Sequence, residues 1–275
     1  MSIAAAFIMP HPPVILPGIG GGDERNIQKT IDSCDAIGKK IGEIKPDIIV
    51  LTSPHCAMYN DYFHISPGKG AIGDFGKFGA KEISMHVEYD DEFVRALEEE
   101  TEKNHINAGT LGEKETSLDH GTMVPLSFVN KYYTSYKLVR ISLSGLSRQE
   151  HYRLGKTIAS VSKKLNRKVV FIASGDLSHK LKEHGPYGLS KEGPLFDKEI
   201  VDIIEKGELK RLMDFEPGFC AKAAECGLSS FIIMSGALDK TELDSQLLSY
   251  EGPFGVGYGA AEFIPRKQSG NMSSK

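Results

Sequence analysis

This sequence has no surplus of basic residues and no long apolar run. Its 33 lysines and arginines are outnumbered by 37 aspartates and glutamates, which gives a formal net charge of −4. A surface that binds nucleic acid needs a basic surplus to neutralise phosphates, so nucleic acid is not an expected partner. No apolar run approaches the roughly 18 residues that cross a membrane, so no membrane partner is expected either.

Cysteines are few, and their spacing excludes the common cysteine-based scaffolds. The four of them (Cys34, Cys56, Cys220 and Cys226) form no CxxC pair and are too sparse for a disulfide framework. Reduced thiols in a cytoplasmic protein are the simplest interpretation, so a cytoplasmic location is expected. The N-terminal apolar stretch has no basic residue before it and ends in His-Pro-Pro, which favours a strand over a signal peptide.

The chain also lacks internal repeats and any linker rich in proline or serine. Its 275 residues, 40% hydrophobic and 25% charged, have the composition of a globular protein with a substantial core. We therefore expect one domain over residues 1–267, followed by a flexible tail over residues 268–275.

The first half of the chain alternates between strand and helix patterns. Two apolar runs, 3–9 and 48–53, are predicted to be buried strands. Between them, residues 23–44 carry isoleucines at three- and four-residue steps, which indicates an amphipathic helix with Asp23 as its N-cap. A strand, helix and strand in this order predict a doubly wound α/β sheet with a right-handed crossover.

The remaining elements are predicted from periodicity and turn residues. Residues 61–66 and 82–89 are expected to be a pair of strands. The glycine-rich segment between them has GxGxxG spacing over 68–73 but opens no helix, so we interpret it as a mobile loop over a site. Helices are expected at 91–103, 122–132, 148–165, 194–206 and 219–238, and further strands at 137–143, 169–174 and 257–264.

Three histidines come shortly after predicted buried strands. His11 lies between prolines after the first strand, His55 follows Ser-Pro after the second, and His179 closes the segment 175–179 after a third. Parallel strands deliver the residues that follow them to one edge of a sheet, where neighbouring ends are about 5 Å apart. Each histidine alone is compatible with an ordinary turn. Two neutral imidazoles, His11 and His55, at that spacing suit a first-row divalent metal.

Other polar residues are placed to reach the same edge. Asp176 can orient an imidazole by accepting its hydrogen bond, which leaves His179 free for acid–base chemistry near neutral pH. His120 comes just before a predicted helix for which Asp119 is a candidate N-cap, and both an exposed His120 and a role in the site are compatible with that position. Tyr187 lies in a tight turn over 184–188, from which its phenol can reach the crevice.

Glu225 and Cys226 directly precede the apolar run 228–238. A carboxylate buried there is costly unless it is paired or bound to metal. With His11 and His55, Glu225 would complete a facial triad of two histidines and one carboxylate, which leaves positions open on Fe(II). Cys226 would instead supply a thiolate, and adjacent helical residues point about 100° apart, so at most one of the two is a ligand. An exposed Glu225 with Cys226 packed in the core is the structural alternative.

These motifs, in this order, resemble the class III extradiol dioxygenase superfamily, the family of the catalytic β-subunit of protocatechuate 4,5-dioxygenase. The matching pieces are His11-Pro-Pro, Ser-Pro-His55, Leu-Asp119-His120-Gly, Ser-Gly-Asp176-Leu-Ser-His179, Glu225-Cys226-Gly and, near the end, Gly255-Val-Gly-Tyr-Gly. Within the superfamily, the Glu-Cys-Gly and Ser-Gly-Asp-Leu-Ser-His segments are most similar to the AmmeMemoRadiSam branch, which has the Memo proteins as relatives.

The resemblance implies an α/β fold: a single domain with a central mixed, largely parallel β-sheet flanked by helices on both faces. It implies that His11 and His55 bind iron, that Glu225 is the candidate carboxylate ligand, and that His179 is the acid–base residue. His120 would contact substrate or oxygen. Memo proteins carry a cysteine before the glycine of this segment, so Cys226 is the other candidate for the third ligand position.

The leading hypothesis is a non-haem Fe(II) enzyme that cleaves a catechol-like aromatic diol with O₂, using His179, His120 and Asp176 in catalysis and Tyr187 in substrate binding. The first alternative is a Memo-like protein that binds Fe, Cu or Zn in redox or maturation chemistry, without ring cleavage. Hydrolysis at Zn²⁺, or by Ser178 with His179, and a pure interaction module are weaker alternatives. A homodimer is compatible with the sequence, which leaves the oligomeric state open.

Overall fold

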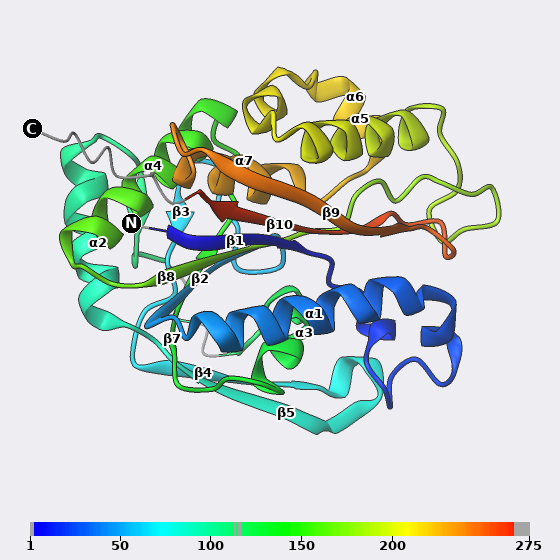
Figure 1. Cartoon of the computed structure of the whole chain (residues 1–275), viewed down its shortest axis with the longest axis horizontal. Helices are drawn as coiled ribbons and strands as arrows, with labels where there is room; N and C mark the ends of the chain where they lie inside the picture. Colours follow the sequence, from blue (N-terminus) through cyan, green and yellow to red (C-terminus); the bar gives the residue numbers. More distant parts are fainter. Residues whose placement is uncertain (1–2, 113, 115–116, 267–275) are drawn as a thin grey trace, which may run out of the picture.

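A six-stranded sheet forms the centre of the computed structural model (Figure 1), which describes residues 3–112, 114 and 117–266. Its strand order is β7-β2-β8-β1-β10-β9. The first four are parallel, whereas β10 is antiparallel to β1 and to β9. The strands are β1 (Ile3–Met9), β2 (Ile48–Ser53), β7 (Lys137–Ser142), β8 (Val169–Ser174), β9 (Leu243–Glu251) and β10 (Tyr258–Pro265). Within the described ranges, no helix is both long and apolar enough to cross a membrane.

The parallel strands are nearly continuous apolar runs because both faces of the sheet are covered. In β1, Ala6 and Ile8 pack into one hydrophobic core, and Ala5, Phe7 and Met9 pack into a second core on the opposite face. Successive side chains of a strand point to opposite faces, so a strand with a core on each side must be apolar at almost every position.

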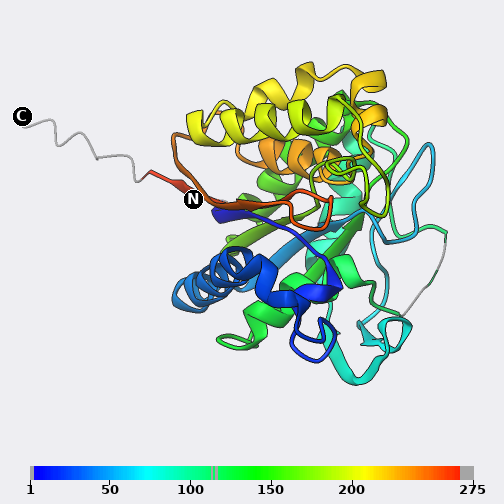
Figure 2. The same ribbon diagram turned by 90° about the vertical axis from the view of Figure 1, so that its right-hand side faces the viewer.

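One face of the sheet is covered by α1 (Gln28–Ile44), α3 (His120–Asn130) and a hairpin of β4 (Gly70–Phe75) and β5 (Ala80–Glu88). The other face carries α2 (Asp91–Lys103), α4 (Arg148–Lys164), α5 (Glu192–Lys206) and α7 (Leu228–Ala237), with α6 (Pro217–Ala223) packed beside α5. Figure 2 shows the two layers on opposite sides of the sheet. Shorter elements are the 3-10 turns η1 (Pro13–Ile15), η2 (Asp23–Ile27), η3 (Gly76–Phe78) and η4 (Leu209–Asp214) and the strands β3 (Phe63–His64) and β6 (Ala108–Gly109).

The predicted α/β fold, with a largely parallel mixed sheet and helices on both faces, is confirmed. The predicted helices at 91–103 and 148–165 correspond to α2 and α4. The helix predicted over 23–44 is instead a 3-10 turn followed by α1, which begins at Gln28. Asp23 is not its N-cap: Gly22, in a left-handed conformation with φ 109°, caps the 3-10 turn, and such a φ is readily adopted only by glycine.

The single helix predicted over 219–238 is wrong. Ala224 adopts a left-handed conformation, with φ 53°, and ends α6. A separate helix, α7, then begins at Leu228, whose backbone N–H donates to the Glu225 carboxylate at 2.7 Å. The apolar pattern spans both helices because both pack on the same core, so periodicity alone does not reveal the break.

The predicted pairing of 61–66 with 82–89 is also wrong. β5 pairs antiparallel with β4, which occupies most of the glycine-rich segment, and β3 pairs with β6. The glycines permit close packing: a Cβ at Gly70 would lie 2.2 Å from the Val87 carbonyl oxygen, and one at Gly73 would lie 2.6 Å from the Leu118 side chain. The proposed mobile loop is therefore a strand. The predicted tail at 268–275 lies outside the described residues.

Candidate functional site

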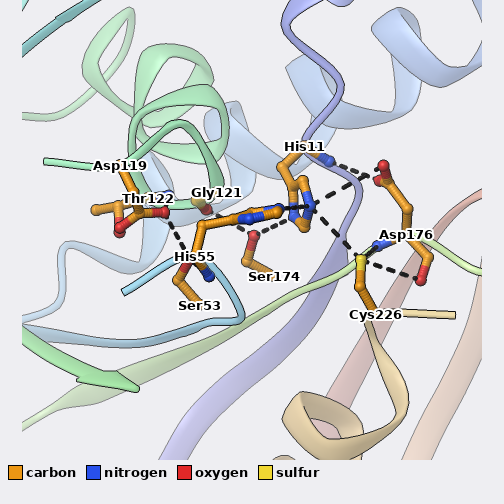
Figure 3. A network of polar contacts seen from close by, with 9 residues as sticks. All are labelled: His11, Ser53, His55, Asp119, Gly121, Thr122, Ser174, Asp176 and Cys226. Atoms are coloured by element: carbon orange, nitrogen blue, oxygen red, sulfur yellow. Dashed lines mark hydrogen bonds and ion pairs between the residues drawn. The ribbon is translucent and has the colours of Figure 1, made fainter. Parts of the chain in front are cut away.

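Three imidazoles meet where the parallel strands end (Figure 3 shows His11 and His55). His11 follows β1, His55 follows β2, and His120 is the first residue of α3. The Nε2 atoms of His11 and His55 are 3.1 Å apart, and the ring centroid of His120 is 4.0 Å from that of His55. Among the described residues, these three form the group of metal-ligating side chains whose ligand atoms all lie within 4.8 Å of one another.

The His11 ring is held in one tautomer by Ser174, the last residue of β8. The Ser174 hydroxyl donates to the Gly121 carbonyl oxygen at 2.6 Å, so its single hydrogen is already used. The 2.9 Å contact between Ser174 Oγ and His11 Nδ1 must therefore be donated by the imidazole. As a result, the proton lies on Nδ1, and Nε2 points its lone pair toward His55 and His120, as in imidazoles that bind metals.

All three imidazoles are uncharged at neutral pH. Burial, followed by the neighbouring His55, lowers the pKa of His11 to about 3. Burial and the two neighbouring imidazoles lower the pKa of His120 to about 3 as well. Burial also lowers the pKa of His55, although Asp119 opposes that shift. The 3.1 Å separation of the two Nε2 atoms suits a shared proton or a cation, and three neutral imidazoles are a donor set that fits a first-row divalent metal.

Asp119 fixes His55 and His120 relative to each other. Its carboxylate caps α3 by accepting from the Thr122 backbone N–H at 3.0 Å, as its predicted N-cap role requires, and it accepts from Ser53 Oγ at 2.6 Å. The same Ser53 oxygen accepts from the His55 backbone N–H at 3.2 Å. Burial by itself raises the pKa of Asp119, but the hydrogen bond from Ser53 and the nearby charge of Arg140 outweigh it and hold the pKa below its usual value.

Asp176 and Cys226 lie on the other side of His11 (Figure 3). Asp176 accepts from the His11 backbone N–H at 2.9 Å, and burial raises its pKa to about 6. It therefore supports the His11 backbone, whereas the ring is oriented by Ser174, a residue that the sequence reasoning missed. Cys226 Sγ is 3.7 Å from His11 Nε2. Burial raises the pKa of this thiol well above its usual value, so it is protonated unless a metal displaces the proton.

Glu225 is not in the imidazole group. Its carboxylate is buried and accepts from the Leu228 backbone N–H, which begins α7. Burial raises the pKa of Glu225, and the hydrogen bond from Leu228 opposes that shift. In the structure, the third side chain beside His11 and His55 is therefore His120, whereas the sequence predicted Glu225. The role of Glu225 as a ligand stays a prediction.

His179 faces the same cavity from the loop after β8. Its ring stacks on that of Tyr187, with the centroids 5.1 Å apart. Its Nε2 is buried and, among the described residues, has no hydrogen-bond partner. Burial lowers the pKa of His179, and the Asp176 carboxyl partly opposes that shift. Ser178 is turned away: its hydroxyl donates to the Ala223 carbonyl oxygen at 2.8 Å, which argues against a nucleophile activated by His179.

A cavity of about 570 Å³ joins these side chains, and this volume is in the range of small-molecule sites. The predicted site residues on its lining are His11, His55, His120, Asp176, His179 and Tyr187. None of the remaining lining residues was predicted as a site residue: they are Pro12, Pro13, Val14, Ile19, Phe78, Pro186, Phe254, Val256 and Tyr258. Phe78 and Phe254 come from hairpin and loop segments with no motif of their own, so only the fold places them here.

Comparison with known proteins identifies the family to which this chain belongs. Residues 5–261 match the family described as the catalytic LigB subunit of aromatic ring-opening dioxygenase. Over 266 residues the chain is 38% identical to Protein CA_C1420 of Clostridium acetobutylicum, a match that covers 94% of this chain and 57% of that longer protein. It is 23% identical to the 2-aminophenol 1,6-dioxygenase beta subunit of Pseudomonas sp, with 95% of this chain and 93% of that one covered.

A third relative matches a shorter region. The 2,3-dihydroxyphenylpropionate/2,3-dihydroxicinnamic acid 1,2-dioxygenase of Escherichia coli is 28% identical over 153 residues, which cover 51% of this chain and 46% of that protein. Among solved structures, the uncharacterized protein JW3007 from Escherichia coli K12 aligns with a TM-score of 0.59 at 16% identity, over 94% of this chain and 99% of that one. At this identity the likeness supports the fold alone.

Proposed function

Because this chain belongs to the family of the catalytic LigB subunit of aromatic ring-opening dioxygenases, we propose that it is a non-haem Fe(II) enzyme that cleaves a catechol-like aromatic diol with O₂ in the extradiol manner. The observation that carries the proposal is the group of three neutral imidazoles, His11, His55 and His120, on the lining of a cavity of about 570 Å³. The Pseudomonas relative, whose name gives 2-aminophenol as its substrate, supports a small aromatic ring with two adjacent polar groups.

His11, His55 and His120 would hold the ion, and the same imidazoles would also accept Zn or Cu. When bound, Fe(II) brings the diol and O₂ together and accepts electron density from the ring. The protein presets this arrangement. Ser174 fixes the tautomer of His11, and the Asp119–Ser53 hydrogen bond ties the loop of His55 to the helix of His120. The ligand atoms are therefore held in place before any ion or substrate arrives.

His179 is the residue that we propose to carry a proton to and from the substrate. Its buried Nε2 has no hydrogen-bond partner within the described part of the chain, which is costly unless a ligand group supplies the missing hydrogen bond. Burial favours its neutral form, which can take a proton from a diol hydroxyl and return it as the ring opens. Stacking on Tyr187 keeps the ring facing the cavity. Asp176 would support this step through its charge, which opposes the effect of burial on the pKa of His179.

The test is anaerobic reconstitution with Fe(II) followed by recording of oxygen uptake with simple catechols. We expect uptake in the wild type and a loss of about 10²–10⁴-fold in turnover for His179→Gln, at unchanged iron content. The control is His86→Gln, because His86 is exposed on β5 and outside the cavity lining. Stoichiometric iron without uptake on any catechol would contradict the proposal.

A second function is favoured by one observation, the 3.7 Å distance from Cys226 Sγ to His11 Nε2. A Memo-like protein would use a thiolate there to hold Fe, Cu or Zn in redox or maturation chemistry, without ring cleavage. The discriminating variants are Cys226→Ser and Glu225→Gln, measured by metal content after dialysis. Ring opening that survives Cys226→Ser with full iron content would exclude this second function.

We further propose a cytoplasmic location and a single catalytic domain over residues 1–267. Support for the location comes from the four cysteines, which are all free thiols, a state typical of reducing compartments. Support for the domain comes from the family match, which spans residues 5–261. Whether the domain pairs with a second copy is left to measurement of its mass in solution.

A further inference from the structure

We infer that the substrate carries an uncharged, apolar ring substituent, and that Phe78 selects it. The inference rests on the proposed function, because it assumes that the imidazole group holds the polar end of an aromatic ligand. It concerns the opposite end of that ligand, which meets the part of the cavity lining that we call the apolar lining. This comprises Pro12, Pro13, Val14, Ile19, Phe78, Phe254 and Val256.

Three separate segments supply the apolar lining. The prolines, Val14 and Ile19 lie in the segment after β1 that contains η1. Phe78 lies in η3 between β4 and β5, and Phe254 and Val256 precede β10. The Phe78 ring contacts the His120 ring edge-on, with the centroids 5.3 Å apart. Apolar side chains therefore begin directly beside the proposed metal-binding group, so a ring bound there would place its substituent against them.

Several of these side chains are left partly exposed to water. Phe78 is 40% exposed, and Val14, Ile19 and Phe254 are half-buried. Exposed apolar surface that gathers in a cavity is typical of a binding site, because a ligand that covers it gains the hydrophobic free energy. A methyl or larger alkyl group on the ring would cover this surface, whereas a hydrogen would leave it wet.

A carboxylate substituent would be poorly placed in the same space. Moving a carboxylate out of water against apolar side chains is costly unless a cation pairs with it. Among the described residues that line the cavity there is no lysine or arginine. Lys77 precedes Phe78 and is close enough to lower the pKa of His120, but it is exposed and does not line the cavity.

The experiment is anaerobic titration calorimetry of the metal-loaded protein with catechol, 4-tert-butylcatechol and 3,4-dihydroxybenzoate. One buried methylene is worth about fourfold in affinity, so we expect 4-tert-butylcatechol to bind at least about tenfold tighter than catechol. We expect 3,4-dihydroxybenzoate to bind more weakly than catechol. Phe78→Ser should abolish the gain from the tert-butyl group, measured as the ratio of the 4-tert-butylcatechol and catechol affinities of the same variant, and Phe78→Leu should retain most of that ratio.

Two control variants test whether Phe78 itself selects the substituent. Ile72→Ser removes another exposed apolar side chain of the same hairpin, 64% exposed and outside the cavity lining, and should change none of the affinities. Lys77→Met removes the cation that precedes Phe78 in the sequence. The inference would be overturned if 3,4-dihydroxybenzoate bound as tightly as 4-tert-butylcatechol, and most directly if Lys77→Met then abolished its binding.

A second pair of ligands distinguishes failure of the inference from failure of the proposed function. Neither 4-tert-butylphenol nor 4-hydroxybenzoate has two adjacent oxygens, so their binding to the same protein tests the apolar lining without diol chemistry. The protein could bind 4-tert-butylphenol more tightly than 4-hydroxybenzoate, lose that preference in Phe78→Ser, and bind no catechol. This result would overturn the diol chemistry and support the apolar recognition. Ring opening of catechols with no preference in either pair would leave the function standing and overturn the inference.

Discussion

The buried carboxyl of Asp197 is expected to make the free energy of unfolding depend on pH. Asp197 lies on α5 and is only 1% exposed. One carboxyl oxygen accepts from the Ser178 backbone N–H at 2.7 Å, and the other contacts the Tyr250 hydroxyl at 2.7 Å. Burial raises the pKa of Asp197 from 3.8 to about 7, and these two hydrogen bonds oppose the shift only in part. Folding therefore favours the protonated form of this group.

The sign of the effect follows from where protons are bound. Between pH 4 and pH 7 the native protein keeps the Asp197 proton and the unfolded chain does not, so the free energy of unfolding falls as the pH rises through this window. Each tenfold difference in proton affinity is worth about 1.4 kcal/mol, so the loss is at most about 4 kcal/mol. Below pH 4 and above pH 7 this group contributes no slope.

Asp197→Asn removes the titration and keeps the shape of the side chain. The amide oxygen can still accept from Ser178, and its NH₂ can donate to the Tyr250 oxygen. We expect wild type and variant to have similar stabilities near pH 4, and the variant to be more stable by up to about 4 kcal/mol at pH 8. Urea unfolding followed by circular dichroism at each pH measures the difference, with Glu205→Gln, an exposed site on the same helix, as the control. A stability difference that is constant from pH 4 to pH 8 would refute the reasoning.

Three further predictions concern the core and the site. Phe171→Ala, in the fully buried strand β8, should lower the free energy of unfolding by about 3–5 kcal/mol in the same urea assay, and a loss below about 1 kcal/mol would contradict the assigned packing. Asp119→Ala removes the cap of α3 and the carboxylate that lies 3.7 Å from the buried Arg140. We therefore expect it to lower the free energy of unfolding by about 3 kcal/mol in the same assay. Ser174→Ala frees the tautomer of His11 and should weaken Zn²⁺ binding about 10–100-fold in competition with a chelator, and unchanged affinity would show that the tautomer is set elsewhere.

Much of the fold follows from local pattern because the parallel strands are apolar at nearly every position. Ile48–Ser53 and Val169–Ser174 are completely buried, as expected of short apolar runs that form strands covered on both faces. The ends of these strands then had to meet at one edge, which is why the meeting of His11 and His55 could be anticipated. The pairing of β4 with β5 could not be anticipated. The glycines of β4 are required by close contacts with Val87 and Leu118, and these contacts exist only in the folded chain.

The rest of the site depends on contacts that leave no local trace. His120 reaches His55 because the Asp119 carboxylate accepts a hydrogen bond from Ser53, 66 residues earlier. In the sequence, Asp119 has the pattern of an ordinary helix N-cap and Ser53 that of an ordinary strand end. Glu225 is a predicted metal ligand because a buried carboxylate needs a partner, and that role stays a prediction. Its partner in the structure is the backbone of Leu228, at the break between two helices that the apolar pattern concealed.

In the proposed site, the imidazoles of His11, His55 and His120 would share one ion. X-ray absorption at the zinc edge of the protein loaded with one equivalent of Zn²⁺ tests it most directly. We predict nitrogen neighbours at about 2.0–2.1 Å with the scattering of three imidazoles, reduced to two in His120→Ala. A sulfur neighbour at about 2.3 Å that Cys226→Ser abolishes, or a shell unchanged by His120→Ala, would contradict the account.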